Sequence, residues 1–75
     1  MDISDVMIHI HEKLDAAACG ALETRIRSLD GVIAPRFNPG KEHQLVVAFD
    51  PNRVRPTELL DAVKAAGYTA QLVGL

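Results

Sequence analysis

The chain begins with an alternation of apolar and polar residues from Val6 to Ile10. This alternation predicts a strand with one buried face, and His9 and His11 then project together from the other face. The period changes after this segment, because the next apolar residues are spaced by three, four and three positions: Cys19, Leu22, Ile26 and Leu29. That spacing predicts an amphipathic helix whose inward stripe contains Cys19.

Two local signals predict where this helix begins and ends. Asp15 can cap its start, because a carboxylate there accepts hydrogen bonds from the free amides of the first turn and meets the positive end of the helix dipole. The pair Asp30-Gly31 is expected to end the helix, since glycine readily takes the left-handed conformation just beyond a last turn.

The middle of the chain predicts two strands joined by a turn. The segment Val32–Phe37 contains Pro35, which cannot donate to a strand ladder, so this strand is expected at a sheet edge. The segment Asn38–His43 has the composition of a turn. Both faces of the next strand are apolar, which predicts a central position in the sheet; its residues are Leu45, Val47 and Phe49 alternating with Val46 and Ala48.

A second helix and a last strand complete the pattern. Pro56 suits the first turn of a helix and Gly67 suits its end, and the segment Thr69–Val73 alternates like a strand. Three apolar residues are expected to form the inward stripe of this helix: Leu59, Val63 and Ala66. The order predicts one α+β domain over residues 1–75, a ferredoxin-like βαββαβ sandwich with a four-stranded antiparallel sheet and two helices on one face.

Three segments resemble heavy-metal-associated (HMA) domains, which occur in copper chaperones, mercury-binding proteins and metal-pumping ATPases: "ALETRIRSLDGV" (21–32), "LVVAFDPNRV" (45–54) and "ELLDAVKAAGYTA" (58–70). The resemblance covers nearly the whole chain and implies the same fold. HMA domains bind metal at a Gly-Met-x-Cys-x-x-Cys loop, which aligns with "EKLDAAA" (12–18). Asp15 and Ala18 stand at its cysteine positions. The chain therefore lacks the paired thiolates that hold Cu(I).

Charge and composition exclude several classes of partner. The formal net charge is −2, and neither sign forms a run that could neutralise several phosphates, so no nucleic-acid partner is expected. No segment approaches the roughly 18 consecutive apolar residues of a membrane span, and the polar, acidic start differs from a signal peptide. The single cysteine rules out an internal disulfide framework. We therefore expect a cytoplasmic protein without a membrane partner.

No enzymatic activity is expected. Acylphosphatases share the βαββαβ arrangement, but the segment after the first strand here holds neither a Gly-rich run nor an arginine that could cradle a phosphate. RNA-binding domains also share it, and they stack bases on aromatic residues of the two central strands. The corresponding exposed positions here are His9, His11, Val46 and Ala48.

His9 and His11 are the candidate metal ligands. Residues two apart on a strand emerge from the same face with about 7 Å between their Cα atoms, and imidazole suits Zn²⁺, Cu²⁺ or Ni²⁺. Two ligands make half a site, so a third would come from Met7, a neighbouring chain or solvent. The alternative is that the two rings cover the open sheet face or lie at an oligomer contact. His43 has no partner nearby in sequence.

Cys19 and Glu12 have simpler interpretations. Cys19 is either a core residue, as its helical stripe indicates, or a thiolate ligand near a helix start, where the dipole lowers the pKa of a thiol. We expect the core position, because free cysteine is among the most frequently buried residue types. Glu12 and Lys13 are expected to form a solvated loop pair.

Two functions from different classes follow. The first is a small metal-handling protein related to HMA domains, which binds an ion through His9 and His11 or passes it to a partner protein. The second is a protein-interaction or regulatory module that self-associates or docks through the open sheet face. In that case the two histidines are expected to stand beside Val46 and Ala48, which together with Val73 form an apolar strip.

Overall fold

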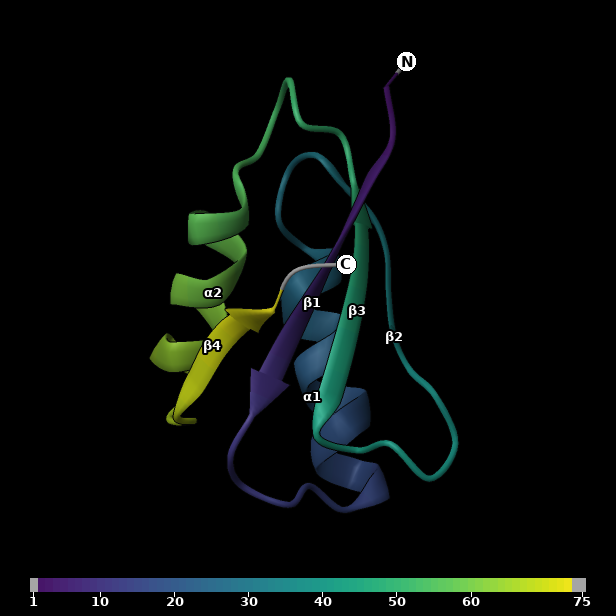
Figure 1. Ribbon diagram of the computed structural model, residues 1–75, viewed down its shortest axis with the longest axis vertical. Helices are drawn as coiled ribbons and strands as arrows, with labels where there is room; N and C mark the ends of the chain where they lie inside the picture. Colours follow the sequence, from purple (N-terminus) through teal and green to yellow (C-terminus); the bar gives the residue numbers. More distant parts are fainter. Residues whose placement is uncertain (1, 74–75) are drawn as a thin grey trace.

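The computed structural model describes residues 2–73 and confirms the predicted ferredoxin-like fold. The elements are β1 (Ser4–Ile10), α1 (Ala16–Arg27), β2 (Val32–Phe37), β3 (Gln44–Phe49), α2 (Pro56–Ala65) and β4 (Ala70–Val73). The strands form one antiparallel sheet in the order β2-β3-β1-β4, so β1 and β3 are central and Pro35 lies on an edge strand. Figure 1 shows α1 behind β1 and β3, and α2 on the same side next to β4.

The core lies between the sheet and the two helices. The alternation in β1 and β3 turns six side chains inward, none more than 9% exposed: Val6, Ile8, Ile10, Leu45, Val47 and Phe49. The helices contribute Cys19, Leu22, Ile26, Leu59 and Val63 to the same cluster. Each large aliphatic side chain buried in this way stabilises the fold by about 1.5–3 kcal/mol relative to an exposed one. The two layers are therefore held together by apolar contact.

α1 ends earlier than the sequence predicted, whereas α2 ends just before Gly67, as predicted, and this glycine has a φ of +101°. α1 ends at Arg27, where the hydroxyl of Ser28 donates to the carbonyl oxygen of Arg25 at 2.6 Å. Leu29 thus lies beyond the helix, although it is partly buried against the core. The expected inward position of Ala66 is wrong: α2 stops at Ala65, and Ala66 is exposed.

Gly31 lies in the turn between α1 and β2 and has a φ of +94°. Its carbonyl oxygen accepts a hydrogen bond of 2.8 Å from the amide of Asp50, which joins this turn to the one after β3. A Cβ atom at position 31 would lie 2.8 Å from the Cβ of Arg53. Only glycine therefore fits both the backbone conformation and the space.

The strand directions bring three connections to one end of the molecule. This end, at the bottom of Figure 1, contains the segment after β1 (11–15), the segment before β3 (38–43) and the segment before β4 (66–69). Among residues 2–73, no helix combines the length and the apolar character needed to cross a membrane.

Gly31→Ala should destabilise the protein more than Gly40→Ala does. Both positions have positive φ, but a Cβ at Gly40 would meet nothing within 4 Å. The control substitution should cost about 1–2 kcal/mol for the left-handed backbone, and Gly31→Ala should add about 1–3 kcal/mol for overpacking. Urea unfolding of both variants measures the difference. Equal losses would show that the approach of Arg53 does not constrain position 31.

Candidate functional site

Three imidazole rings lie together where β1 ends and β3 begins. The ring centroids of His9 and His11 are 5.2 Å apart with the planes at 82°, and those of His9 and His43 are 6.2 Å apart with the planes at 25°. His9 and His11 are brought together by the strand alternation, as the sequence predicted. His43 comes from the turn before β3 and was missed, because only the register between β1 and β3 reveals it.

The ring of His43 is held by the backbone of Ile10. The Nδ1 atom of His43 lies 2.9 Å from the carbonyl oxygen of Ile10, and the amide of Ile10 donates to the carbonyl oxygen of His43 at 2.8 Å. A carbonyl oxygen only accepts hydrogen bonds, so Nδ1 is the donor. The neutral ring then carries its lone pair on Nε2. His43 thus has a defined orientation and a defined tautomer.

A pair of hydrogen bonds fastens the loop after β1 to the residue before β4. The amide of His11 donates to the carbonyl oxygen of Thr69, and the amide of Thr69 donates to Oε1 of Glu12, both at 2.9 Å. The bond from Thr69 is the main reason why the pKa of Glu12 lies below its usual value, and the nearby His11 lowers that pKa further. Glu12 and Lys13 are both exposed, as expected for solvated loop residues, and the carboxylate of Glu12 also ties this loop to Thr69.

The strand register corrects the predicted neighbours of the histidines. His9 lies opposite Gln44 on β3 and Gln71 on β4, not beside Val46 and Ala48. Those two residues lie further along β3, opposite Met7 and Asp5 of β1, because antiparallel pairing advances the two chains in opposite directions. His9 therefore has polar neighbours on both adjacent strands.

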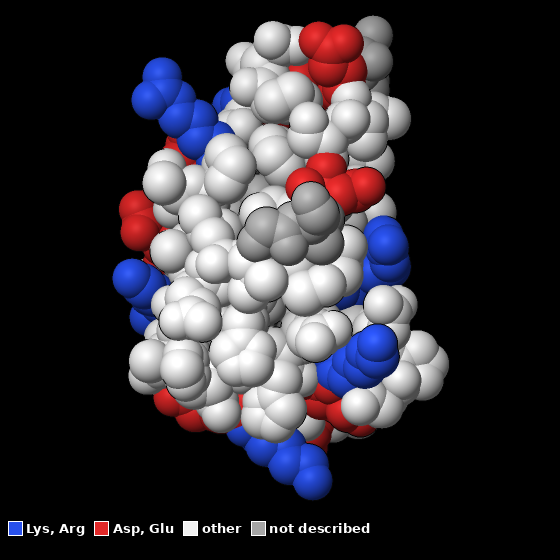
Figure 2. All heavy atoms as spheres, in the orientation of Figure 1, with Lys and Arg blue, Asp and Glu red and all other residues white. Residues whose placement is uncertain are grey.

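The open sheet face is largely uncharged but does not expose the predicted apolar strip. Val46 is only 6% exposed, between Met7 on β1 and Arg36 on β2, whereas Val73 on the edge strand β4 is 36% exposed. Figure 2 shows this side of the molecule, where most of the visible residues are uncharged and most charged side chains lie toward the margins. The large apolar side chains that are exposed are instead spread over the N-terminal segment, β2 and β4: Ile3, Ile33, Leu72 and Val73.

Asp15 and Ala18 lie next to each other at the start of α1. Oδ1 of Asp15 accepts a hydrogen bond of 2.8 Å from the amide of Ala18, so Asp15 is the predicted N-cap. These are the positions that align with the two cysteines of HMA domains. The first turn of α1 therefore presents a cap rather than a pair of thiolates.

Cys19 belongs to the core, as its stripe predicted. Its side chain is 8% exposed and packs in the cluster between the helices and the sheet. Burial is the main cause that raises the pKa of its thiol, and the carboxylates of Glu42, Glu23 and Asp15 raise it further. A neutral buried thiol is a poor metal ligand and a poor nucleophile.

The histidines form a cluster rather than a finished coordination site. Among residues 2–73, no three or more His, Cys, Asp or Glu side chains are arranged to hold a metal ion as they stand. Any ion bound here requires the rings to turn. His11 is exposed and His9 is partly exposed, so both have room to do so.

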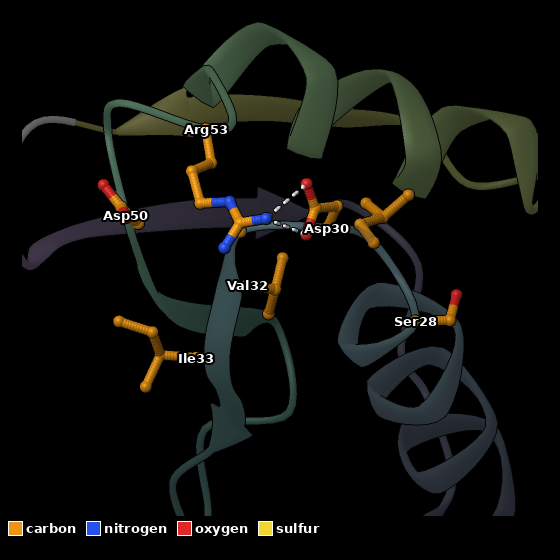
Figure 3. A pocket seen from close by; sticks show the side chains of 8 residues that line it. Ser28, Asp30, Val32, Ile33, Asp50 and Arg53 are labelled. Carbon is orange, nitrogen blue, oxygen red and sulfur yellow. Dashed lines mark hydrogen bonds and ion pairs between the residues drawn. The ribbon is translucent and has the colours of Figure 1, made fainter.

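A second surface feature is a hollow of about 400 Å³ at the opposite end of the sheet, lined by residues 28–33, Asp50 and Arg53. Nη2 of Arg53 lies 3.1 Å from Oδ1 of Asp30 and 3.2 Å from Oδ2 (Figure 3). The guanidinium is thus engaged by a carboxylate, which disfavours anion binding in this hollow.

Comparisons with known proteins support the fold. No protein-family model matches the chain, and no curated protein matches it in sequence. The structure is similar to oxidized MerP from Ralstonia metallidurans CH34, with a TM-score of 0.85, 20% identity, and coverage of 97% of this chain and 100% of that chain. It is also similar to the CopZ metallochaperone, with a TM-score of 0.82, 22% identity, and coverage of 91% of this chain and 100% of that chain. A copper binding domain of HMA7, a P-type ATPase, gives a TM-score of 0.83 and 20% identity, with 93% of each chain covered. The chain therefore has the HMA-like fold, without the Cys-x-x-Cys motif.

Cys19 should react slowly with a thiol reagent under native conditions, because its side chain is buried and its raised pKa keeps thiolate scarce at neutral pH. Cys19→Ala should lower the free energy of unfolding by about 1 kcal/mol through lost packing. Labelling kinetics followed by mass spectrometry, with the urea-unfolded chain as reference, measure the protection. Native labelling as fast as in urea would contradict the core position.

Proposed function

We propose that this protein handles a divalent transition metal ion, Zn²⁺, Cu²⁺ or Ni²⁺, which it binds through His9 and His11. The observation that carries this proposal is the 5.2 Å between their ring centroids. Two imidazoles on one tetrahedral ion, with bonds of ~2.0–2.1 Å, have ring centres roughly 5 Å apart. To bind one ion, the two rings therefore need to rotate, but the distance between their centroids hardly has to change.

The fold supports a metal-handling role by resemblance. Two of the similar structures are named as a metallochaperone and as a copper binding domain. This chain differs from the HMA pattern because Asp15 and Ala18 replace the paired cysteines, so Cu(I) is a poor match for it. Imidazole favours a borderline divalent ion instead. The proposed role is binding or transfer to a protein partner rather than catalysis, in the reducing cytoplasm that a single cysteine suits.

One observation favours a second function, docking or self-association through the open sheet face. Val73 on the edge strand β4 lies opposite Met7 on this face and is 36% exposed. Apolar exposure on an edge strand is a feature that a second chain can cover. In this case His9 and His11 would contribute to the contact instead of binding an ion.

Titration of the metal-free protein with Zn²⁺, Cu²⁺ and Ni²⁺, followed by calorimetry and native mass spectrometry, tests the first function. At least one of these ions should bind, and His9→Ala or His11→Ala should weaken its affinity about tenfold or more, equivalent to ~1.4 kcal/mol. Gln71→Ala is the matched control, because Gln71 lies opposite His9 on the same face and its loss should change little.

Sedimentation of the same samples separates the two functions. A protein that binds none of these ions but self-associates would have the second function. A protein that binds an ion equally well without His9 and His11 would place the ion elsewhere and contradict the site.

Restoring the dithiol should create Cu(I) binding at a different place. Residues 15 and 18 are adjacent on the first turn of α1, so Asp15→Cys combined with Ala18→Cys should bind Cu(I) far more tightly than the native chain. Loss of the Asp15 cap should cost about 1 kcal/mol. Competition with a Cu(I) chelator measures the affinity, and circular dichroism confirms folding. A folded double variant without tight Cu(I) binding would show that the alignment of residues 12–18 with the HMA loop is wrong.

A further inference from the structure

We propose that His43 is the third ligand of the same site and that Ile10 holds it in the tautomer that binds metal. This inference rests on the proposed function, since it adds a residue to the site of His9 and His11. The ligand class is a divalent ion that accepts three neutral imidazoles and keeps a further position open, which is a common arrangement for Zn²⁺.

The hydrogen bond of His43 determines which of its nitrogens is available. Nδ1 donates to the carbonyl oxygen of Ile10 at 2.9 Å, so Nε2 of the neutral ring carries the lone pair. Histidines that bind metal in proteins almost always donate their other ring N–H to a carbonyl, a carboxylate or water, and this bond orients the ring. His43 already has such a partner, so its orientation does not have to be acquired on binding.

The same bond ties His43 to the other two histidines. The carbonyl of Ile10 belongs to the peptide that precedes His11, and His9 lies one residue before Ile10 on β1. One short backbone segment therefore fixes the positions of all three side chains relative to one another. A site assembled on a paired strand end is more rigid than one assembled on a free loop.

The distances define how far the rings must move. The 6.2 Å between the centroids of His9 and His43 is about 1 Å longer than the roughly 5 Å expected for two imidazoles on one tetrahedral ion. His43 is held by Ile10, whereas His11 is exposed, so we infer that His9 and His11 turn toward His43. This movement explains why three histidines can lie together without forming a finished site.

The local charge also suits a cation. Glu12 follows His11, and its carboxylate is held in place by the amide of Thr69. Imidazole binds metal in its neutral form, so the three rings and this neighbouring carboxylate together favour a divalent cation over an anion.

His43→Asn tests this inference, because the asparagine amide can still donate to the carbonyl oxygen of Ile10 but offers no Nε2. We expect the affinity for Zn²⁺ to fall about 10–100-fold or more, with the urea midpoint of the metal-free protein unchanged. Suppose that the wild-type protein binds Zn²⁺, that His9→Ala loses this binding, and that the Zn²⁺ affinity of His43→Asn stays within about twofold of the wild-type value. This result would overturn the role of His43 and leave the proposed function standing. A wild-type protein that binds none of the divalent ions would overturn both.

Nitrogen NMR of the wild-type protein gives a second test that does not depend on a variant. The metal-free His43 should be in the Nδ1–H tautomer, and addition of Zn²⁺ should shift its Nε2 resonance. An Nε2–H tautomer, or an Nε2 resonance unmoved when Zn²⁺ is bound at His9 and His11, would contradict the proposal.

Discussion

The antiparallel pairing of β1 with β3 is the interaction on which the rest of the structure depends. These strands are the central pair of the sheet, and Val6 pairs with Val47 and Ile8 with Leu45 in their register. All four side chains are buried, so the register is fixed by apolar contact with the helices. A slip of one residue by either strand would turn its own two side chains to the open face, which is why this alignment is strongly specified.

The same register creates the histidine cluster on the opposite side of the sheet. Because the inward residues of β1 are buried, His9 must face outward. The pairing of the two strands continues one residue beyond the start of β3, where His43 pairs with Ile10. The packing of the core therefore also determines where the three histidines lie. Glu12 and Thr69 then close the remaining side of this end by joining the loop after β1 to β4.

Local patterns predicted most of the fold because each element carries its own signal. Alternation identified β1 and β3, Pro35 marked an edge strand, and the cap at Asp15 lies where its carboxylate predicted. The end of α1 was less predictable, since the apolar periodicity continues to Leu29 whereas the helix ends at Arg27.

The candidate site was only partly predictable for a related reason. His9 and His11 are close in sequence, and the strand period alone places them on one face. The position of His43 and the burial of Val46 depend on which residues face each other across two strands, and a single sequence does not specify that register. Contacts between distant segments are therefore where the structure adds most.

The bond between the His43 ring and Ile10 has a consequence for how the end of the sheet opens. The ring bond and the backbone bond between the same two residues close the end of the central strand pair β1–β3, so fraying of the start of β3 breaks both of them together. An ion that binds His43 only in the closed form would oppose this fraying, and by reciprocity a more stable end of this strand pair would bind the ion more tightly. Binding of an ion to the three histidines and local opening of this end of the sheet would then be thermodynamically coupled.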